Sequence, residues 1–539
     1  MVFVGLAIGL CGRHGCGQEG GPDAPAPSLR PVTLAGCVRL ALDNNFQLKA
    51  HRLAAGASAT GVAAAAGAFD PVLRSRGSYG DQTSPTASAL EGTQAPGGSA
   101  SGGFTGNLGP GFPASTTTND SPAVPRRQSY SWDLSLEKKF ATGTEVAVSY
   151  SFERLKTNQY FATINPSYTD QVQFHVTQPL LRGGWFTANL AGLRQSENQR
   201  QMAREQLRTA TDDLVFNVQQ TYWNLVYALE NLDVTRESLR LAETLKRDNL
   251  EKFKAGTMTR LDVTQADFEI ATRKNEVLRA SAAVKNTVDR LRQYVDPEGF
   301  DADPAEEWHP IDRPLQRGEK APPFAAALAE AFVHRGDWRE GQLAYENAKI
   351  NEDDYRNQVL PKVDLTYSLR YNGLGGNASD PMRDVLRAEY DSWSVGFLLE
   401  WPLGNQSARA NYLRAVLDRR RVQADLEELR ARIHLEIREA VREINTTFDT
   451  ITQTREALRF AREQLKGEQA RLEVGKSTSY QVLDIQEDLA QAQINERRAL
   501  LDHMIARAQL ERSKGTLLRY FGLAAAPRPG GEERRGDGP

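Results

Sequence analysis

The sequence predicts a mainly helical fold with a smaller set of β-strands, assembled from one helix-hairpin-helix unit that occurs twice. The repeat is visible at 251–266, EKFKAGTMTRLDVTQA, and at 470–485, ARLEVGKSTSYQVLDI, where a glycine separates two long stretches of helical pattern. Gly256 and Gly475 stand 219 residues apart. A fixed internal period of this kind indicates duplication, so two copies of one unit occupy most of the 539 residues.

The two copies differ in length because of one insertion. AFDPVL matches QVLPKVDL around Pro71 and Pro361, which are 290 residues apart. TQPLLRGG matches EWPLGN around Pro179 and Pro402, which are 223 residues apart. The difference of 67 residues therefore lies between the two prolines of the first copy, where we expect an extra hairpin and its loop.

Strand patterns occur in both copies. In the second copy, a hairpin at 362–401 has apolar residues at alternate positions: Val363, Leu365, Tyr367, Leu369 and Tyr371, then Trp393, Val395, Phe397, Leu399 and Trp401. In the first copy, four candidate strands lie at about 72–178, interrupted by a Ser/Thr/Gly/Pro-rich loop at 81–127 that we expect to be disordered. Whether the extra hairpin, at 130–153, joins the same sheet stays open.

The alternation has two readings. It fits an outer-membrane barrel with one face toward lipid, and it fits a soluble antiparallel hairpin with one buried face equally well. No uninterrupted apolar run approaches the ~20 residues that a spanning helix needs. A membrane crossing by this chain would therefore use strands.

The helical part carries a heptad pattern. Apolar residues recur every seven positions in both copies: Ile444, Ile451, Leu458, Leu465 and Leu472, and Val218, Leu225, Leu232 and Leu239. The helix expected from about Phe186 to Lys254 has ~70 residues, and at ~1.5 Å per residue it is on the order of 100 Å long. Heptads alone favour a soluble coiled-coil scaffold. Heptads together with barrel-like hairpins shift the balance away from that scaffold.

Each glycine break is followed by a helix start signal. Thr259 and Thr478 stand three residues after the glycines, and Asp262 and Gln481 follow three residues later. This Thr-x-x-Asp/Gln pattern predicts a capping box at the start of each second helix. The two glycines suit the left-handed backbone conformation that commonly ends a helix. We therefore expect two capped helical hairpins of one design.

Composition argues against several classes of function. The net charge of −3, from 66 basic and 69 acidic residues, offers no basic stripe for nucleic acid. The seven histidines show no metal-ligand spacing, and no hydrolase, phosphate-loop or zinc-peptidase motif occurs. We therefore expect no enzyme activity, no catalytic or metal-binding residues and no cofactor. His434 and His503 are expected to be exposed helix residues.

The domain plan follows from these patterns. We expect a signal-like or disordered N-terminus at 1–30, a first repeat at 31–298, a linker at 299–323, a second repeat at 324–523 and a disordered tail at 524–539. The cysteines are Cys11, Cys16 and Cys37. The tetrad LAGC that ends at Cys37 looks like a lipoprotein box, but it lies inside a helical pattern, so a helical cysteine is favoured over lipidation.

In their order and duplication, these segments resemble the TolC-like family of outer membrane efflux proteins over roughly Pro31 to Leu523. The similarity runs through TLAGCVRLALDNNFQLKAHRLAAGASA, AFDPVL, TQPLLRGG, FKAGTMTRLDVTQADFEIA and LEVGKSTSYQVLDIQEDLAQA. The resemblance implies a homotrimer in which each chain gives strands to a shared transmembrane β-barrel and long helices to a coiled-coil α-barrel. It implies a place in the cell outer membrane with a periplasmic extension.

The same resemblance implies a function. The chain would be the passive exit duct of a tripartite efflux or type I secretion system, in contact with a periplasmic adaptor (membrane fusion) protein and an inner-membrane pump. A soluble or peripheral coiled-coil scaffold is the alternative. Drug, metal and protein ducts share one architecture, so the sequence does not choose a substrate.

Functional positions are implied at the hairpin ends. Adaptor docking is expected at the periplasmic tips, at Gly256, Thr257, Thr259, Leu261, Asp262, Gly475, Ser477 and Thr478. The family often places two aspartates after the second tip glycine, where they ring the closed aperture and bind cations. Here these positions hold Gln481 and Asp484. With one carboxylate in place of two, we expect weaker cation binding.

Overall fold

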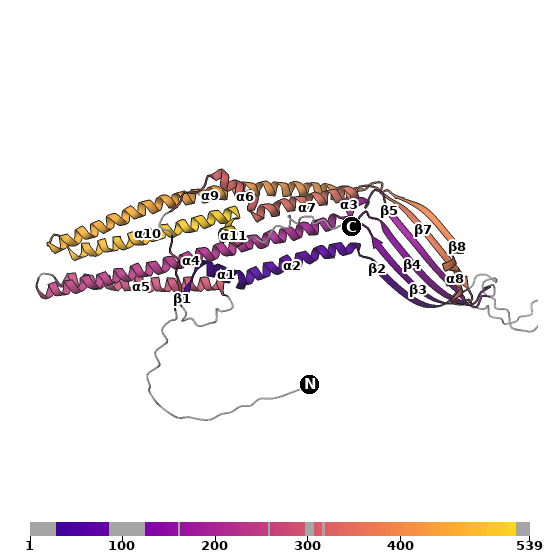
Figure 1. Cartoon of the computed structure of the whole chain (residues 1–539), viewed down its shortest axis with the longest axis horizontal. Coiled ribbons are helices and arrows are strands. Elements are labelled where there is room, and N and C mark those ends of the chain that lie inside the picture. Colours follow the sequence, from indigo (N-terminus) through magenta and orange to yellow (C-terminus); the bar gives the residue numbers. More distant parts are fainter. Residues whose placement is uncertain are drawn as a thin grey trace, which may run out of the picture. The chain divides into compact units, whose positions relative to one another are not determined.

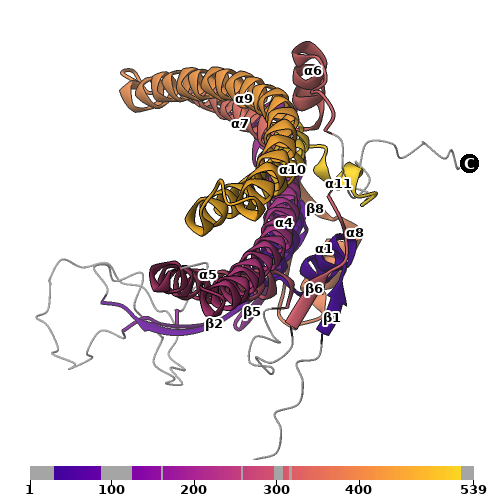
Figure 2. The same cartoon turned by 90° about the vertical axis from the view of Figure 1, so that its left-hand side faces the viewer.

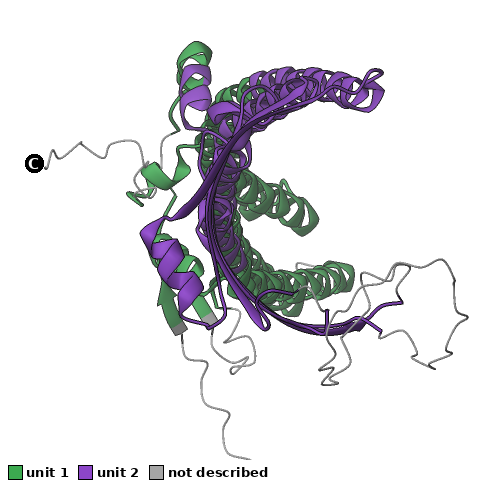
Figure 3. Cartoon of the chain, turned by 90° about the vertical axis from the view of Figure 1, so that its right-hand side faces the viewer, with its two compact units in different colours: residues 1–49, 211–327, 437–539 green, residues 50–210, 328–436 purple. Residues whose placement is uncertain are grey.

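The computed structural model describes residues 29–85, 124–159, 162–256, 259–296, 307–314 and 318–523 (Figure 1). They form two compact units (Figure 3): unit 1 comprises residues 1–49, 211–327 and 437–539, and unit 2 comprises 50–210 and 328–436. Each unit is therefore built from both repeats. The tail predicted at 524–539, and most of the N-terminus and of the loop predicted at 81–127, lie outside the described residues.

Unit 2 contains one sheet of six strands, all paired antiparallel, in the order β2-β3-β4-β5-β7-β8. The strands are β2 (Val72–Thr83), β3 (Arg126–Lys139), β4 (Glu145–Thr157), β5 (Ser167–Pro179), β7 (Lys362–Gly375) and β8 (Tyr390–Glu400). The strand predictions for both copies are confirmed. The extra hairpin of the first copy, β3 and β4, lies between β2 and β5, so it joins the sheet that the second copy also enters.

The two faces of this curved sheet (Figure 3) differ in polarity. One row of directly paired residues crosses all six strands and is apolar: Leu73, Leu136, Val148, Phe174, Leu369 and Trp393. The next row lies on the opposite face and is polar: Arg74, Ser135, Ser149, Gln173, Arg370 and Ser392. Successive side chains of a strand point to opposite faces, so the predicted alternation becomes one apolar and one polar surface.

Helices adjoin the sheet in unit 2. They are η1 (Gly67–Phe69), α3 (Trp185–Asn189), α7 (Gly336–Gln358), α8 (Asp380–Arg387), most of α2 (Phe46–Ala66) and the first parts of α4 (Ala191–Lys254) and α9 (Gln406–Glu473). Gly336 of α7 lies against Thr209, and Gly341 faces Leu426. Helix α7 therefore packs against both long helices, and the absent side chains at its glycines permit the close approach.

The long helices form as predicted, with one difference at their start. Helices α4 and α9 contain 64 and 68 residues, and α5 (Arg260–Val295) and α10 (Ser479–Lys514) contain 36 each. The helix expected from Phe186 begins at Ala191, because Leu190 ends the separate short helix α3. The heptad positions are buried along most of the seam: Val218, Leu225, Leu232, Ile444, Ile451, Leu458 and Leu465.

In unit 1, the helices of both hairpins lie around one concave side when viewed from the hairpin ends (Figure 2). This unit also contains α1 (Leu34–Asn44), α11 (Leu517–Tyr520), part of α6 (Phe324–His334), and a small parallel sheet of β1 (Leu29–Val32) and β6 (Glu307–Pro310). The sheet, which the sequence did not predict, joins the N-terminal segment to the linker. Tyr222 supports it, since its hydroxyl donates to Asp312 Oδ2 at 2.8 Å.

Two sequence-based expectations for single residues have different outcomes. Cys37 lies in α1 and is buried, as expected of a helical cysteine, and burial raises the pKa of its thiol to about 11. His503, expected to be exposed, is buried in α10. Its ring accepts a hydrogen bond from Glu319 N at 3.1 Å and lies 3.0 Å from Thr447 Oγ1. The expectation is wrong because the linker folds over this face of α10.

Within the described residues, none of the helices combines the length and the apolar character that crossing a membrane requires.

Candidate docking and gating site at the helix-hairpin ends

The first tip, residues 251–262, turns through a left-handed glycine. Gly256 has φ 78°, and its N–H donates to Phe253 O at 2.9 Å. A Cβ added at Gly256 would meet nothing within 4 Å. The backbone conformation, rather than crowding, therefore demands glycine here. Thr257, predicted to belong to this tip, lies outside the described residues.

The second tip, residues 470–481, has the same turn. Gly475 has φ 74°, its N–H donates to Leu472 O at 3.1 Å, and Lys476 N donates to Arg471 O at 2.8 Å. These two bonds form a Schellman motif, which satisfies carbonyls that the end of α9 leaves free. A Cβ at Gly475 would also meet nothing within 4 Å. Both glycines thus serve as helix terminators at matching places in the repeat.

Both predicted capping boxes are confirmed. Thr259 begins α5: its N–H donates to Asp262 Oδ2 at 3.0 Å, and Asp262 N donates back to Thr259 Oγ1 at 3.4 Å. Thr478 begins α10 with Gln481 in the same role, at 3.2 Å and 3.3 Å. Each box satisfies two backbone amides that a helix start would leave without partners. The second helix of each hairpin therefore begins with a fully formed cap.

Ser477 extends the cap of the second tip back to the preceding helix. Its hydroxyl donates to Glu468 of α9 and lies 3.0 Å from Gln481 Oε1 of α10. Glu468 also pairs with Arg471 at 3.2 Å. The hydrogen bond from Ser477, followed by the charge of Arg471, lowers the pKa of the Glu468 carboxyl. Ser477 therefore links the end of α9 to the start of α10 by hydrogen bonds.

A buried arginine joins the first hairpin to the second, and the sequence analysis missed it. Arg273 of α5 is 2% exposed and pairs with Glu269 at 2.8 Å. It also donates to Ser238 O of α4 and, through Nη2, to Leu483 O of α10, each at 3.2 Å. The available signal was its spacing, since Arg273 follows the buried Ile270 by three residues on the packed face of α5.

Apolar and polar contacts surround this arginine. Ala242 of α4, Ile270 of α5 and Leu483 of α10 form one buried cluster. Closer to the tips, the buried Ser479 hydroxyl donates to Asn249 Oδ1 at 3.0 Å. Three helices are therefore held together by one apolar cluster and two polar links, one of them charged. Buried polar links of this kind are costly to break, so they resist separation of the three helices.

The outer surfaces of the tips are exposed and partly apolar. Leu261 is 65% exposed, and Val474 and Tyr480 are 67% and 60% exposed. Asp484, predicted to lie at the aperture, is exposed on α10, one turn after the capping residue Gln481. The structure thus brings the described ones among the predicted residues of each tip together, with apolar side chains exposed beside them.

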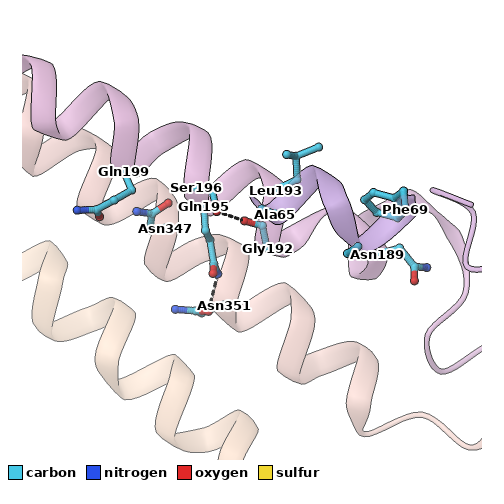
Figure 4. A pocket seen from close by; sticks show the side chains of 11 residues that line it. Ala65, Phe69, Asn189, Gly192, Leu193, Gln195, Ser196, Gln199, Asn347 and Asn351 are labelled. Carbon is cyan, nitrogen blue, oxygen red and sulfur yellow. Dashed lines mark hydrogen bonds between the residues drawn. The ribbon is translucent and has the colours of Figure 1, made fainter. Parts of the chain in front are cut away.

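A separate groove of about 640 Å³ lies in unit 2, lined by α2, η1, α3, α4 and α7 (Figure 4). Its polar lining consists of neutral side chains: Asn189, Gln195, Ser196, Gln199, Asn347 and Asn351. Gln195 Nε2 donates to Asn351 Oδ1 at 2.6 Å, and Ser196 Oγ donates to Gly192 O at 2.9 Å. The residues that line the groove include neither a charged side chain nor a nucleophile paired with a base.

Comparison with known proteins follows the same division into repeats. The chain matches the family model described as outer membrane efflux protein at residues 144–295 and 328–516, together more than half of its length. It is 23% identical over 353 residues to the outer membrane protein TolC of Vibrio cholerae serotype O1, an alignment that covers 62% of this chain and 74% of that protein.

Solved structures show the same fold. The outer-membrane channel OprN has a TM-score of 0.62 to this chain at 17% identity, with 90% of each chain covered. The CmeC outer membrane channel of Campylobacter jejuni has a TM-score of 0.60 at 16% identity, with 90% of this chain and 86% of that chain covered. The predicted fold class is thereby confirmed, and the matching family model confirms the predicted outer-membrane location. The chain belongs to the outer membrane efflux protein family.

Proposed function

We propose that this chain is the exit duct of a tripartite efflux or type I secretion system. In this proposal three copies assemble into one duct, which docks on a periplasmic adaptor protein that is joined to an inner-membrane pump. Transport through the duct is passive, because the pump supplies the energy and substrate then diffuses through a water-filled lumen. Family membership supports this function over the coiled-coil scaffold.

The observation that carries the proposal is the matched pair of hairpin tips. Two turns 219 residues apart use the same left-handed glycine and the same threonine cap. Among the described residues none packs over either glycine, and exposed apolar side chains stand near both. Capped helix ends with exposed apolar flanks suit docking to a partner, since little ordering of these helix ends is lost on binding. Docking therefore involves both tips of each copy in our proposal.

Gating follows from the contacts between the hairpins. Arg273 and Ser479 hold α5 and α10 in one packed group with α4. In the proposed mechanism, adaptor binding at the tips replaces these contacts, and the helices move outward to widen the aperture. The neutral Gln481 and the carboxylate of Asp484 then line the mouth in each copy.

A double substitution at the tips tests the function. Gly256→Arg with Gly475→Arg adds bulk and charge at two left-handed positions, where an added side chain meets nothing within 4 Å but strains the backbone of the turn. We expect loss of adaptor binding and of export, with the native mass unchanged. Gly522→Arg is the matched control, because Gly522 also has a left-handed φ of 66° at a helix end, a Cβ there also meets nothing within 4 Å, and the residue lies outside both tips.

Two results would contradict the proposal. One is full export and full adaptor binding by the double variant. The other concerns the native mass. After extraction in mild detergent, the proposed duct should have about three times the 59.7 kDa chain mass. A monomer recovered without detergent would instead support the soluble scaffold.

A further inference from the structure

The six-stranded sheet of unit 2 ends in two open edges. Strand β2 pairs only with β3, and β8 pairs only with β7, within the described residues. The outer side of each edge strand therefore presents a row of backbone N–H and C=O groups. Long, exposed edges of this kind invite pairing with another chain. They call for a partner with the same strand geometry.

The two edges fit each other in direction and length. Because six strands alternate in direction, β2 and β8 run opposite ways, so β2 of one copy meets β8 of the next copy antiparallel. Strand β2 has 12 residues and β8 has 11. An even number of strands in each copy lets the same contact recur around a ring until it closes.

The faces of the two edges also fit. Leu73 and Tyr79 of β2 lie on the apolar face, as do Trp393 and Leu399 of β8. All four side chains are more than half exposed in the single chain. On the polar face, Arg74 of β2, which pairs with Glu137 in the single chain, would lie diagonally opposite Glu400, which pairs with Arg182, when the strand ends are level. Apolar side chains thus continue apolar side chains, and the charges are complementary.

The stagger of the strands gives the pairing register. Val72, which begins β2, lies in the same row as Ser394 of β8, six residues before Glu400, where β8 ends. If the strand ends are level in the assembly, Val72 of one copy lies beside Glu400 of the next. Six residues of shift over six strands correspond to a tilt of about 35°, which lies within the range of membrane barrels.

We infer that β2 of one copy pairs with β8 of the next, with Leu73 beside Leu399, and that three copies close a barrel of eighteen strands. The count of three rests on the proposed function. If the first repeat contributed two strands, as the second does, three copies would close only twelve. Because barrel diameter grows roughly linearly with strand number, the inserted hairpin widens the barrel about 1.5-fold. Such a barrel suits bulky solutes or polypeptide chains.

Disulfide trapping tests the pairing. Directly opposite residues of an antiparallel pair lie close enough for a disulfide. Leu73→Cys combined with Leu399→Cys is expected to give, after oxidation in membranes and denaturation, a covalent species of about three times the 59.7 kDa chain mass. Each single variant should stay at the mass of one chain. Leu136→Cys with Leu399→Cys is the matched control, since Leu136 lies in the interior strand β3 on the same face.

Several outcomes would overturn the inference. A disulfide within one chain would mean that the sheet closes on itself, and a product that stops at two chains would mean a smaller ring. Registers shifted by two residues keep the same faces, so Leu73→Cys is also paired with Phe397→Cys and with Trp401→Cys. Failure of all three pairs in a properly inserted protein excludes the contact between the edges.

This experiment separates the inference from the proposed function. Trapping is carried out in membranes that lack the adaptor and the pump, so its result does not depend on export. Trimeric cross-linking, combined with no export by the unaltered chain in cells that contain the adaptor and the pump, would leave the eighteen strands in place and contradict the duct. Export by a trimer that cannot be cross-linked in any of the three registers would contradict only the eighteen-stranded barrel.

Discussion

Arg273 Nη2 donates a hydrogen bond to the carbonyl oxygen of Leu483 across 3.2 Å, although the two residues are 210 positions apart in the chain. Both partners are nearly inaccessible to solvent, at 2% and 5% exposure. The bond joins α5 of the first hairpin to α10 of the second. A buried guanidinium with a carboxylate and two backbone carbonyls as partners fixes the spacing of helices more strictly than apolar packing does.

Replacing Arg273 should loosen the closed state. Arg273→Met keeps most of the side-chain volume but removes the donors to Ser238 O and Leu483 O. Hydrogen bonds to charged groups contribute about 1.5–3 kcal/mol each, so the closed arrangement loses much of its advantage. We expect at least a twofold higher single-channel conductance in planar bilayers. Arg279→Met, at an exposed position of the same helix, should leave the conductance unchanged. Equal conductance of both variants would show that Arg273 has no part in closure.

The capping threonines should stabilise the tips in similar amounts. Thr259→Ala and Thr478→Ala each remove the hydroxyl that accepts a backbone N–H at the helix start. Loss of such a cap costs about 1 kcal/mol. Hydrogen exchange of amides in the first turns of α5 and α10 should become about fivefold faster. Thr264→Ala is the control, because the Thr264 hydroxyl donates to Arg260 O inside the helix and caps nothing. Unchanged exchange in both cap variants would contradict the stabilising role.

The sequence predicted the parts of this fold that depend on local chemistry. The caps at Thr259 and Thr478 depend on residues only three positions away in the sequence. The apolar row through Leu369 and Trp393 likewise follows from alternation within each strand. Each of these features needs only a helix or a strand to form. They can therefore be predicted from the sequence without knowledge of the tertiary contacts.

The missed features depend on residues far apart in the chain. The β1 and β6 pair joins strands almost three hundred residues apart, and Tyr222 meets Asp312 across 90 positions. Burial of His503 depends on the linker near Glu319, 184 positions away. In sequence, Arg273 is not distinguished from the other charged residues of the coiled coil. Its burial becomes apparent only when α10 of the second hairpin is packed against it. Helical periodicity in the sequence does not predict such long-range contacts.

The aperture should respond weakly to cations until a second carboxylate is restored. Asp484 supplies one carboxylate per copy, and Gln481 is neutral. Gln481→Asp should preserve the cap, because Asp262 fills the equivalent position in α5. We expect at least a tenfold stronger block of conductance by hexamminecobalt in this variant, since like charges brought together bind a cation more tightly. Asp484→Ala should remove the residual block. Strong block that survives Asp484→Ala would exclude these residues from the aperture.

Acid should weaken the attachment of the linker through His503. Nε2 of His503 accepts a hydrogen bond from Glu319 N, so the neutral ring carries its proton on Nδ1, which faces Thr447 Oγ1. Burial, followed by the charge of Arg507, lowers the pKa of His503, while the carboxylate of Glu319 acts in the opposite direction. The unfolded chain therefore binds this proton more readily than the folded chain. The stability that neutral His503 contributes is fully present above the ordinary histidine pKa of about 6.5 and is lost as the pH falls from there toward the lowered value.

Thermal unfolding in detergent between pH 5 and 8 measures this effect. His503→Gln retains an acceptor for Glu319 N but cannot take up the proton, so its melting temperature should fall less with acidification than that of the unaltered protein. His51→Gln changes an exposed histidine of α2 and should keep the original pH dependence. If both variants retain the full acid sensitivity, the buried ring is not the group that titrates. If only His503→Gln reduces the dependence of the melting temperature on pH, protonation of His503 at its contact with the linker accounts for the acid sensitivity of unit 1.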